Sequence, residues 1–316
     1  MNVDLERLYE ALGSRYWCWV FQSHEPAPPQ SVLALLLQEL PHISADSWEQ
    51  RFAWGGVFVN GRGINQDVAL SAPCKVEYYE PKAELADLAS RFPTFDPKRH
   101  IIFEDDFLLA AFKPAGLPSL PTREQRAHNL CAYLEQHLRT KIHMPSRLDH
   151  SCSGLILVSK STKTHSLLQH AYEKRLVTKH YLLETTGECA WTSKRVEAPI
   201  EKDPRHPVLR RVSQEAGQAA VTEFNVLNRL PSGSGQPRLL LEAKPLTGRT
   251  HQIRVHIASL GMPIAGDNFY NGAPEQELRL LSYRLQLKHP LSAKKLDLHL
   301  PDSLCPTWLE KWRRLV

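Results

Sequence analysis

Hydrophobic and polar positions alternate with two different periods along the first 81 residues. Leucines recur at helical spacing between residues 31 and 41, where Ser31 can cap a helix, and residues 46–54 predict a second helix. An Asn-Gly pair closes the apolar run 57–62, which predicts a hairpin, and residues 68–79 predict further strands. Two short helices followed by a hairpin indicate a small α+β domain.

From residue 100 onward, short branched apolar runs alternate with amphipathic stretches. The runs predict buried strands, and the stretches between them predict helices with one apolar face. The expected strands are 101–103, 107–112, 155–158, 177–186, 221–229 and 238–244, and the expected helices are 129–139, 162–175 and 250–260. Ser161 and Thr250 stand where helix caps are expected, and Leu167, Leu168 and Ala171 form the expected apolar stripe of the helix 162–175.

These patterns predict an α+β protein with two domains. The expected organisation is an N-terminal extension (1–30), a small domain (31–81), a linker (82–99) and a large domain (100–316). Within the extension, the aromatic run 16–21 fits either an edge strand or an interface patch.

The composition is that of a globular protein, because 42% of the 316 residues are hydrophobic and 23% are charged. The six cysteines are scattered without a Cys-x-x-Cys pair, so neither a zinc site nor a disulfide framework is indicated. A reduced, intracellular protein is expected, and the sequence predicts no export signal and no membrane-spanning segment.

The net charge of +5 is unevenly distributed along the chain. The first 81 residues carry five Lys and Arg against ten Asp and Glu, a net charge of −5, which leaves +10 for the remainder. A basic body of this size suits a polyanionic partner, although a modest excess of basic residues is also common on proteins that bind no nucleic acid.

The most informative stretch for chemistry is 143–154, a polar turn that precedes the apolar run 155–158. Arg147 and Asp149 lie in this turn, two positions apart, so both side chains can point the same way against the core. Burial raises the pKa of a carboxyl group and a neighbouring guanidinium lowers it, and such competition is typical of catalytic acids. An Arg-x-Asp in a loop can also be a helix cap or a surface ion pair. Other segments of the sequence are therefore needed to tell a catalytic pair from a structural one.

Three basic or aromatic positions lie on or beside predicted strands. Lys113 follows the strand 107–112 at a Lys-Pro-x-Gly turn, where it is either solvated or able to contact phosphate. On the strand 177–186, Lys179 and Tyr181 share one face because side chains alternate. Tyr181 can therefore pack in the core or stack on an unstacked base.

The segment 247–261 combines a helix start with basic side chains. Free amides at the helix N-terminus beside Arg249 favour a phosphate or a carboxylate. His251 and His256 are five residues apart, which is the wrong spacing for a helical zinc pair. Core or RNA-facing histidines are therefore expected, and no metal site.

Four motifs occur in the order and at about the spacing found in one enzyme family. They are Lys113-Pro114-x-Gly116, Arg147-Leu148-Asp149-x-x-x-Ser153-Gly154, Lys179-x-Tyr181, and Thr247 to His256 continuing through Gly261-x-Pro263-Ile264-x-Gly266-Asp267. Over residues 100–300 the chain therefore resembles the RluA-type RNA pseudouridine synthases. The resemblance implies a curved, mixed and largely antiparallel sheet with flanking helices, and the isomerisation of uridine to pseudouridine with no metal and no cofactor.

The resemblance also implies a role for each candidate site residue. Asp149 matches the family's catalytic carboxylate, Arg254 the arginine that pairs with it, and Tyr181 the tyrosine that stacks on the target base and helps to remove the C5 proton. Arg147 matches the arginine that helps to occupy the place of the flipped-out nucleotide. The residues expected to contact the RNA are Lys113, Lys179, Arg249 and His251. Whether the carboxylate attacks the sugar, attacks C6 of the ring or acts through a glycal is left open by the sequence.

Residues 31–80 resemble the S4 RNA-binding module, with one difference. The second helix of that module carries several basic residues, whereas here Arg51 stands beside two acidic residues, so a structural appendage is the alternative to an RNA-binding one. The large domain also departs twice from its family. Cys152 replaces the usual Thr, and Leu280-Leu281-Ser282-Tyr283 replaces the usual Leu-His-Ala.

Two other functions compete with this interpretation. An RNA-binding protein without catalysis is disfavoured by the intact Asp149, Tyr181 and Arg254. A hydrolase that uses Ser, His and Asp is disfavoured because the chain has no Gly-x-Ser-x-Gly motif. The expected partner is ribosomal or transfer RNA in the cytoplasm, and the sequence specifies neither the RNA nor the oligomeric state.

Overall fold

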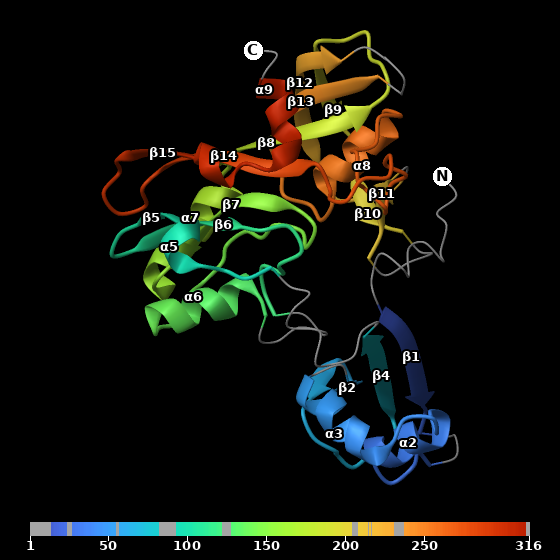
Figure 1. Ribbon diagram of the computed structural model, residues 1–316. Coiled ribbons are helices and arrows are strands. Elements are labelled where there is room, and N and C mark those ends of the chain that lie inside the picture. Colours follow the sequence, from blue (N-terminus) through green and yellow to red (C-terminus); the bar gives the residue numbers. More distant parts are fainter. Residues whose placement is uncertain are drawn as a thin grey trace. The chain divides into compact units, whose positions relative to one another are not determined.

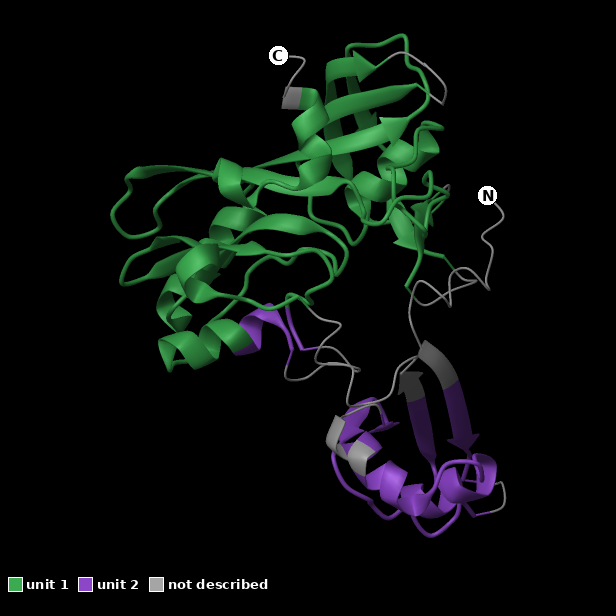
Figure 2. Ribbon diagram, viewed as in Figure 1, with its two compact units in different colours: residues 1–3, 93–119, 133–316 green, residues 4–92, 120–132 purple. Residues whose placement is uncertain are grey.

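A computed structural model describes residues 14–23, 27–54, 57–81, 93–121, 128–203, 208–213, 215, 217–230 and 237–313. The chain divides into two compact units, one formed by residues 4–92 and 120–132 and the other by residues 1–3, 93–119 and 133–316 (Figure 2). The domain boundaries expected from the sequence stay predictions, and residues 82–92 of the expected linker lie outside the described residues. Of the helices in the described ranges, none combines enough length with enough hydrophobicity to span a bilayer.

The small unit is a four-stranded antiparallel sheet with two helices packed on it (Figure 1). Its strand order is β1-β4-β2-β3, and the first helix begins at the expected cap, where the Ser31 hydroxyl accepts a hydrogen bond from the amide of Ala34. Asn60 and Gly61 adopt positive φ angles of 48° and 76°, as a two-residue hairpin requires. The elements are β1 (Ser14–Phe21), α2 (Val32–Glu39), α3 (Ala45–Trp54), β2 (Val57–Val59), β3 (Arg62–Ile64) and β4 (Cys74–Pro81).

The aromatic run near the N-terminus forms the edge strand β1, which pairs with β4 along its whole length. Trp17 of this strand stacks on Tyr78, with ring centroids 5.4 Å apart. The guanidinium of Arg51 donates a hydrogen bond to the Tyr78 hydroxyl and lies 5.7 Å from the ring centroid of the buried Trp48. The arginine of α3 is therefore engaged within the small unit, and the resemblance to the S4 module stays a prediction.

The large unit is built on a nine-stranded sheet of order β5-β6-β7-β14-β8-β13-β12-β9, in which β15 also pairs with β14 (Figure 1). Among the described strands of this sheet, β7 and β14 run parallel and the other pairs are antiparallel. Helix α7 packs against β7, and α8 packs against β11, β12 and β13. The mixed, largely antiparallel sheet with flanking helices is the α+β class predicted from the sequence.

The remaining elements follow the sequence in this order. They are α5 (Pro97–His100), β5 (Ile101–Glu104), β6 (Leu108–Lys113), α6 (Leu130–Leu138), β7 (Ser153–Ser159), α7 (Thr162–Glu173), β8 (Thr178–Thr186), β9 (Ser193–Glu197), β10 (Ile200–Lys202), β11 (Arg210–Val212), β12 (Val221–Leu230), β13 (Arg238–Pro245), α8 (Gln252–Ser259), β14 (Leu280–Lys288), β15 (Lys295–His299), two 3-10 turns at Asp302–Leu304 and Thr307–Leu309, and α9 (Glu310–Arg313).

Helix α7 begins where the sequence predicted, and the Ser161 hydroxyl accepts a hydrogen bond from the amide of Thr164 at 3.2 Å. Its buried stripe is formed by Leu168, which is fully buried, with Ala171 packed beside it. The prediction that Leu167 belongs to this stripe is wrong, because that side chain is exposed. Successive side chains of a helix are rotated by about 100°, which is enough to place Leu167 on the solvent-exposed face while Leu168 is buried.

The parallel contact between β7 and β14 is short and depends on a glycine. Residues 153 and 154 pair with residues 281 and 282. Gly154 has a φ of +123°, and a Cβ added there would lie 2.2 Å from the carbonyl oxygen of Ser282 and 2.5 Å from its nitrogen. Both atoms belong to the backbone of a central strand, so neither can move aside cheaply. Gly154 thus lets β14 lie beside the strand that follows the Arg147-x-Asp149 turn.

Gly154→Ala is expected to lower the free energy of unfolding of the large unit by about 3 kcal/mol or more, because the added Cβ overlaps two backbone atoms. Gly261→Ala is the matched control. Its φ of +77° carries a similar backbone strain, but nothing lies within 4 Å of the added Cβ, so a loss of only about 1 kcal/mol is expected. Urea unfolding followed by circular dichroism measures both variants. Equal losses would contradict this account of the β7–β14 contact.

Candidate active site

The turn between residues 147 and 152 is fixed by hydrogen bonds from an earlier segment. The Ser119 hydroxyl donates to the carbonyl of Leu148 at 2.8 Å and accepts from the amide of Leu148 at 3.2 Å. The amide of Cys152 donates to the carbonyl of Asp149 at 3.1 Å. The turn therefore presents Asp149 from a fixed backbone. Sequence reasoning missed Ser119, because its partner lies 29 positions away in the chain.

Lys113 is fully buried, and its ammonium donates to three carbonyl groups. The acceptors are Leu117 at 2.7 Å, Pro114 at 2.9 Å and His150 at 3.2 Å. Three acceptors match the three N–H donors of an ammonium. Burial lowers the pKa of Lys113 to about 8, which still leaves most of it charged at neutral pH. The prediction that Lys113 contacts RNA is therefore wrong, since its donors are used to tie two turns of the protein together.

Asp149 lies at the centre of the site, and 22% of its side chain is exposed. Its Oδ2 lies 3.5 Å from Nη1 of Arg254 and 4.0 Å from Nε2 of His251. Burial alone would raise the pKa of this carboxyl group, but His251 and the guanidinium groups of Arg254 and Arg147 lower it below its ordinary value. Asp149 is thus ionised at neutral pH, as a nucleophile or a charge stabiliser has to be.

Arg254 of α8 is buried between two carboxylates. Its Nε and Nη2 form a fork on Asp267, at 2.7 Å and 2.6 Å, while Nη1 faces Asp149. The rings of Phe269 and Tyr270 lie over the guanidinium, with centroids 4.9 Å and 5.2 Å from Cζ. The structure brings Arg254 and Asp149 together, and it adds a shorter pair with Asp267. The signal for Asp267 was in the sequence, because this residue closes the last of the four motifs.

His251 stands directly before α8 in the left-handed conformation, with a φ of 57°. Its Nδ1 is hydrogen-bonded to the hydroxyl of Tyr270 at 2.8 Å, and its Nε2 faces Asp149. Burial, helped by the charge of Arg254, lowers the pKa of His251 to about 4. The imidazole is therefore neutral at neutral pH, so the guanidinium groups are the cations that stabilise the charge of Asp149.

Arg147 and Arg249 are both exposed at the edge of the site. Arg147 donates to the Thr250 hydroxyl at 3.3 Å and thereby joins the Asp149 turn to the start of α8. The prediction that Thr250 caps α8 is wrong, because the cap position belongs to His251, which makes no side-chain capping bond. Arg249 donates through Nε to the carbonyl of Ala219 at 3.1 Å. The expected contacts of both arginines with RNA stay predictions.

Tyr181 of β8 pairs across the sheet with Ser282 of β14 and Ala243 of β13. It is 7% exposed, and burial, with Cys152 nearby acting in the same direction, raises its pKa well above 10. At neutral pH Tyr181 is therefore a phenol that can stack or donate a hydrogen bond, and proton removal as a base needs another group. Lys179, on the same strand, lies with Nζ 5.8 Å from the ring centroid of Tyr172.

His256 is a core histidine, which is one of the two roles expected for it. It is fully buried, its Nδ1 is hydrogen-bonded to the Thr222 hydroxyl at 2.9 Å, and its Nε2 to the carbonyl of Ala198 at 2.9 Å. Among the residues that the structure describes, no group of three or more His, Cys, Asp or Glu side chains is arranged to hold a metal ion.

Comparison with known proteins identifies the family. Residues 108–259 match the sequence profile of the family described as RNA pseudouridylate synthase. The dual-specificity RNA pseudouridine synthase RluA of Vibrio vulnificus is 33% identical over 218 residues, which cover 68% of this chain and 87% of that protein. This chain belongs to the RluA-type RNA pseudouridine synthases.

Two further relatives of this pseudouridine synthase agree with that assignment. The mitochondrial tRNA pseudouridine(32) synthase of Saccharomyces cerevisiae is 36% identical over 171 residues, which cover 54% of this chain and 37% of that protein. The solved structure of human RNA pseudouridylate synthase domain containing 1 has the same fold, with a TM-score of 0.57 and 23% identity over 68% of this chain and 88% of that one.

The departures of this pseudouridine synthase from its family lie where β14 meets its neighbours. The thiol of Cys152 donates to the carbonyl of Leu280 at 3.4 Å, and burial raises the pKa of Cys152 to about 12, so it stays protonated. The hydroxyl of Ser282 donates to the carbonyl of Leu155 at 3.0 Å. Both side chains therefore hold β14 in place beneath the site.

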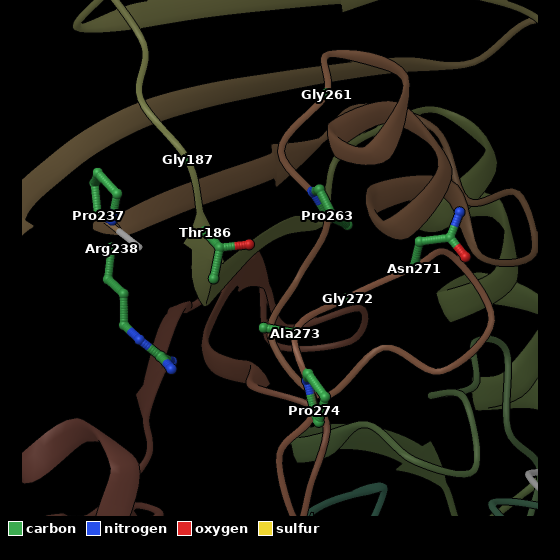
Figure 3. A pocket seen from close by; sticks show the side chains of 10 residues that line it. All are labelled: Thr186, Gly187, Pro237, Arg238, Gly261, Pro263, Asn271, Gly272, Ala273 and Pro274. Atoms are coloured by element: carbon green, nitrogen blue, oxygen red, sulfur yellow. The ribbon is translucent and has the colours of Figure 1, made fainter. Parts of the chain in front are cut away.

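A cavity of about 760 Å³ lies elsewhere in the large unit (Figure 3). The ends of β8 and β13 and the segments 261–263 and 271–274 contribute to its lining. Arg238 lines it, but the guanidinium is paired with Glu184 at 2.6 Å and with Glu275 at 2.7 Å. None of the eight predicted site residues is among the residues that line this cavity, so it is separate from the cluster around Asp149.

Lys113→Met is expected to destabilise the enzyme by about 2–4 kcal/mol, because it removes three hydrogen bonds and puts an apolar side-chain end among three carbonyl groups. The same variant is expected to leave the salt dependence of RNA binding unchanged. Binding of a transfer RNA transcript at several salt concentrations measures this dependence. If the slope of log K against log[salt] became shallower by about 0.7–0.9, the value for one lost phosphate contact, then Lys113 would bind RNA after all.

Proposed function

We propose that this enzyme isomerises specific uridines in structured ribosomal or transfer RNA, and that Asp149 is the carboxylate on which the reaction depends. The observation that carries the proposal is an ionised, partly exposed Asp149 whose electrostatic neighbours include Arg254 and Tyr181. Two relatives, a dual-specificity RNA pseudouridine synthase and a tRNA pseudouridine(32) synthase, support an RNA substrate, and the second supports transfer RNA.

The reaction itself explains why one carboxylate can be sufficient. The bond between N1 of uracil and C1′ of ribose breaks, the base turns, and C1′ is joined to C5. The proton of C5 is lost and N1 gains a proton, so the product is an isomer and no electrons are exchanged with another reagent. A negative charge fixed beside the reacting sugar and base can act as nucleophile or stabilise a developing positive charge. The ionised state of Asp149 supports either role.

The target nucleotide has to leave the base stack before it can reach a partly buried carboxylate. Tyr181, as a neutral phenol, is suited to stack on the extruded base. Arg147 is exposed and tied to Thr250 at the edge of the site, which supports a role in filling the vacated place. Lys179, Arg249 and His251 are proposed to contact the substrate from the strand and helix on either side.

The enzyme is proposed to act in the cytoplasm. The six cysteines are free thiols, which fits the reducing cytoplasm. No metal or cofactor is proposed, because an isomerisation with one carboxylate requires neither. The catalytic domain is proposed to span residues 100–316 and to supply most of the RNA affinity. The acidic balance of the first 81 residues and the engagement of Arg51 with Tyr78 support that division of roles for the S4-like segment 31–81.

Asp149→Asn is expected to abolish pseudouridine formation while RNA binding persists, because the charge is lost and the size is kept. The measurement maps pseudouridines in total RNA by carbodiimide labelling and reverse-transcription stops. Four strains are compared: one with the intact gene, one without it, and one each with Asp149→Asn and Asp106→Asn. Asp106 is an exposed aspartate in the β5–β6 turn, so its variant should retain every site. Persistence of every site, both without the gene and in the Asp149→Asn strain, would overturn the proposal.

Arg147→Ala is expected to lower kcat/KM by about 10–100-fold, because the nucleotide that is flipped out is no longer replaced. Arg147→Lys keeps the charge and loses the planar fork, so it separates the two properties. We expect the lysine variant to recover only part of the activity. Steady-state kinetics on the RNA site found by mapping measure both, and full activity of Arg147→Ala would exclude this role.

A further inference from the structure

Asp267 is the most deeply buried carboxylate of the site. Its side chain is fully buried, and its Oδ1 accepts a hydrogen bond from the amide of Phe269 at 3.1 Å as well as from Arg254. The amide of Gly272 donates to the carbonyl of Asp267 at 2.8 Å, which closes the turn that carries it. Asp267 is therefore held by the backbone of its own turn, and it cannot follow Arg254 if that side chain moves.

The guanidinium of Arg254 is shared unequally between its two carboxylates. Its contacts with Asp267 are 2.7 Å and 2.6 Å, the lengths of strong charge-assisted hydrogen bonds. Its contact with Asp149 is 3.5 Å, which is an ion pair but longer than such a bond. The fork on Asp267 uses Nε and Nη2, and Nη1 makes the shortest contact with Asp149.

The same turn also limits rotation of the guanidinium. Phe269 and Tyr270 cover it at 4.9 Å and 5.2 Å, and Tyr270 is itself fixed by its hydrogen bond to His251. Residues 267–270 therefore hold Arg254 in place, through the hydrogen bonds to Asp267 and through the two aromatic rings that cover the guanidinium. Rotation toward Asp149 would require the two short bonds to Asp267 to break.

The position of the Arg254 guanidinium affects Asp149. Its shortest contacts with Arg254 and His251 are both made by Oδ2, at 3.5 Å and 4.0 Å, so neither has the length of a strong hydrogen bond. A carboxylate with both oxygens bound in an arginine fork is stabilised in its ground state, and that stabilisation is lost when it attacks or solvates a reacting atom. A long contact with Arg254 helps to keep Asp149 charged without the ground-state stabilisation of a fork.

We propose that Asp267 is a positioning residue that holds the guanidinium of Arg254 in a fork, keeps the contact of that guanidinium with Asp149 long, and so leaves Asp149 available to the flipped uridine. This inference rests on the proposed function, in which Asp149 is the reacting carboxylate.

Asp267→Asn tests the inference, because the amide has one acceptor oxygen and cannot accept the fork. We expect the single-turnover rate constant to fall about 10–100-fold at saturating enzyme, while the Kd for RNA changes less than about twofold. The probe is RNA purified from cells that lack the gene, and conversion is followed at the uridine that mapping identifies. A merely structural role would lower the fraction of enzyme that binds RNA without changing the rate of the bound fraction.

Asp297→Asn is the matched control. Asp297 also holds an arginine in a fork, with 2.8 Å and 2.6 Å to Arg284, but on the partly exposed face of β14 and β15. The same chemical change is made there without touching the site, so no change of rate is expected. A loss of rate in this variant as large as that of Asp267→Asn would overturn the inference.

A double-mutant cycle shows whether Asp267 acts through Arg254. Lysine cannot form a fork, so Arg254→Lys already removes the interaction. Adding Asp267→Asn to Arg254→Lys should then lower the rate less than twofold further, and a full multiplicative loss would overturn the inference. If Asp267→Asn does not fold, Asp267→Glu decides, because it keeps the charge and displaces the fork. We expect its rate to fall with the Kd unchanged, and a rate equal to that of the natural enzyme would overturn the inference.

The outcomes also separate this inference from the proposed function. If the natural enzyme converts no uridine in the probe RNA, the proposed function fails first. If the natural enzyme is active, Asp149→Asn is inactive and Asp267→Asn reacts at the natural rate, only the positioning role of Asp267 fails.

Discussion

A guanidinium that is buried with two carboxylates sets the constraint around which this enzyme is built. Arg254 cannot leave its position without leaving Asp267 charged and unpaired in the interior, and Asp149 relies on the same cation to stay ionised. The three groups come from α8, from the turn after it and from the turn before β7. The sheet has to bring these segments within hydrogen-bonding distance, and the parallel contact at Gly154 is one place where it does so.

Local signals in the sequence were enough for many of the elements and for the position of Asp149, but the sequence analysis did not predict β9, β10, β11, β14 or β15. Ser31, Ser161 and the Asn60-Gly61 pair act within a few residues of themselves, so their effects could be predicted from neighbouring positions. The polar turn followed by a branched apolar run likewise fixed the place of Asp149 at the start of a buried strand. The family motifs then brought Tyr181 and Arg254 into the same site before any geometry was known.

The errors at Lys113 and Thr250 share one physical cause, which is that the partners lie far apart in the sequence. Lys113 looks like a surface lysine at the end of a strand until His150, 37 positions later, supplies a third carbonyl. Thr250 looks like a cap until Arg147, 103 positions earlier, takes its hydroxyl. Lys113 and Arg147, like Arg51 and Arg254, use hydrogen-bond donors for contacts within the protein. Net charge therefore overstates how much positive surface this enzyme offers to RNA.

The pairing of β7 with β14 also has a consequence for the order in which the site is built during synthesis. Cys152, three residues after Asp149, is hydrogen-bonded to Leu280, which the ribosome adds 128 residues later. At about 5–20 residues per second, this interval lasts roughly 6–25 s. During that time the nascent chain already carries Asp149 but not the strand that completes its support. Asp149 therefore gains the support of β14 only after residue 280 and its neighbours have been added, although its own turn is made much earlier.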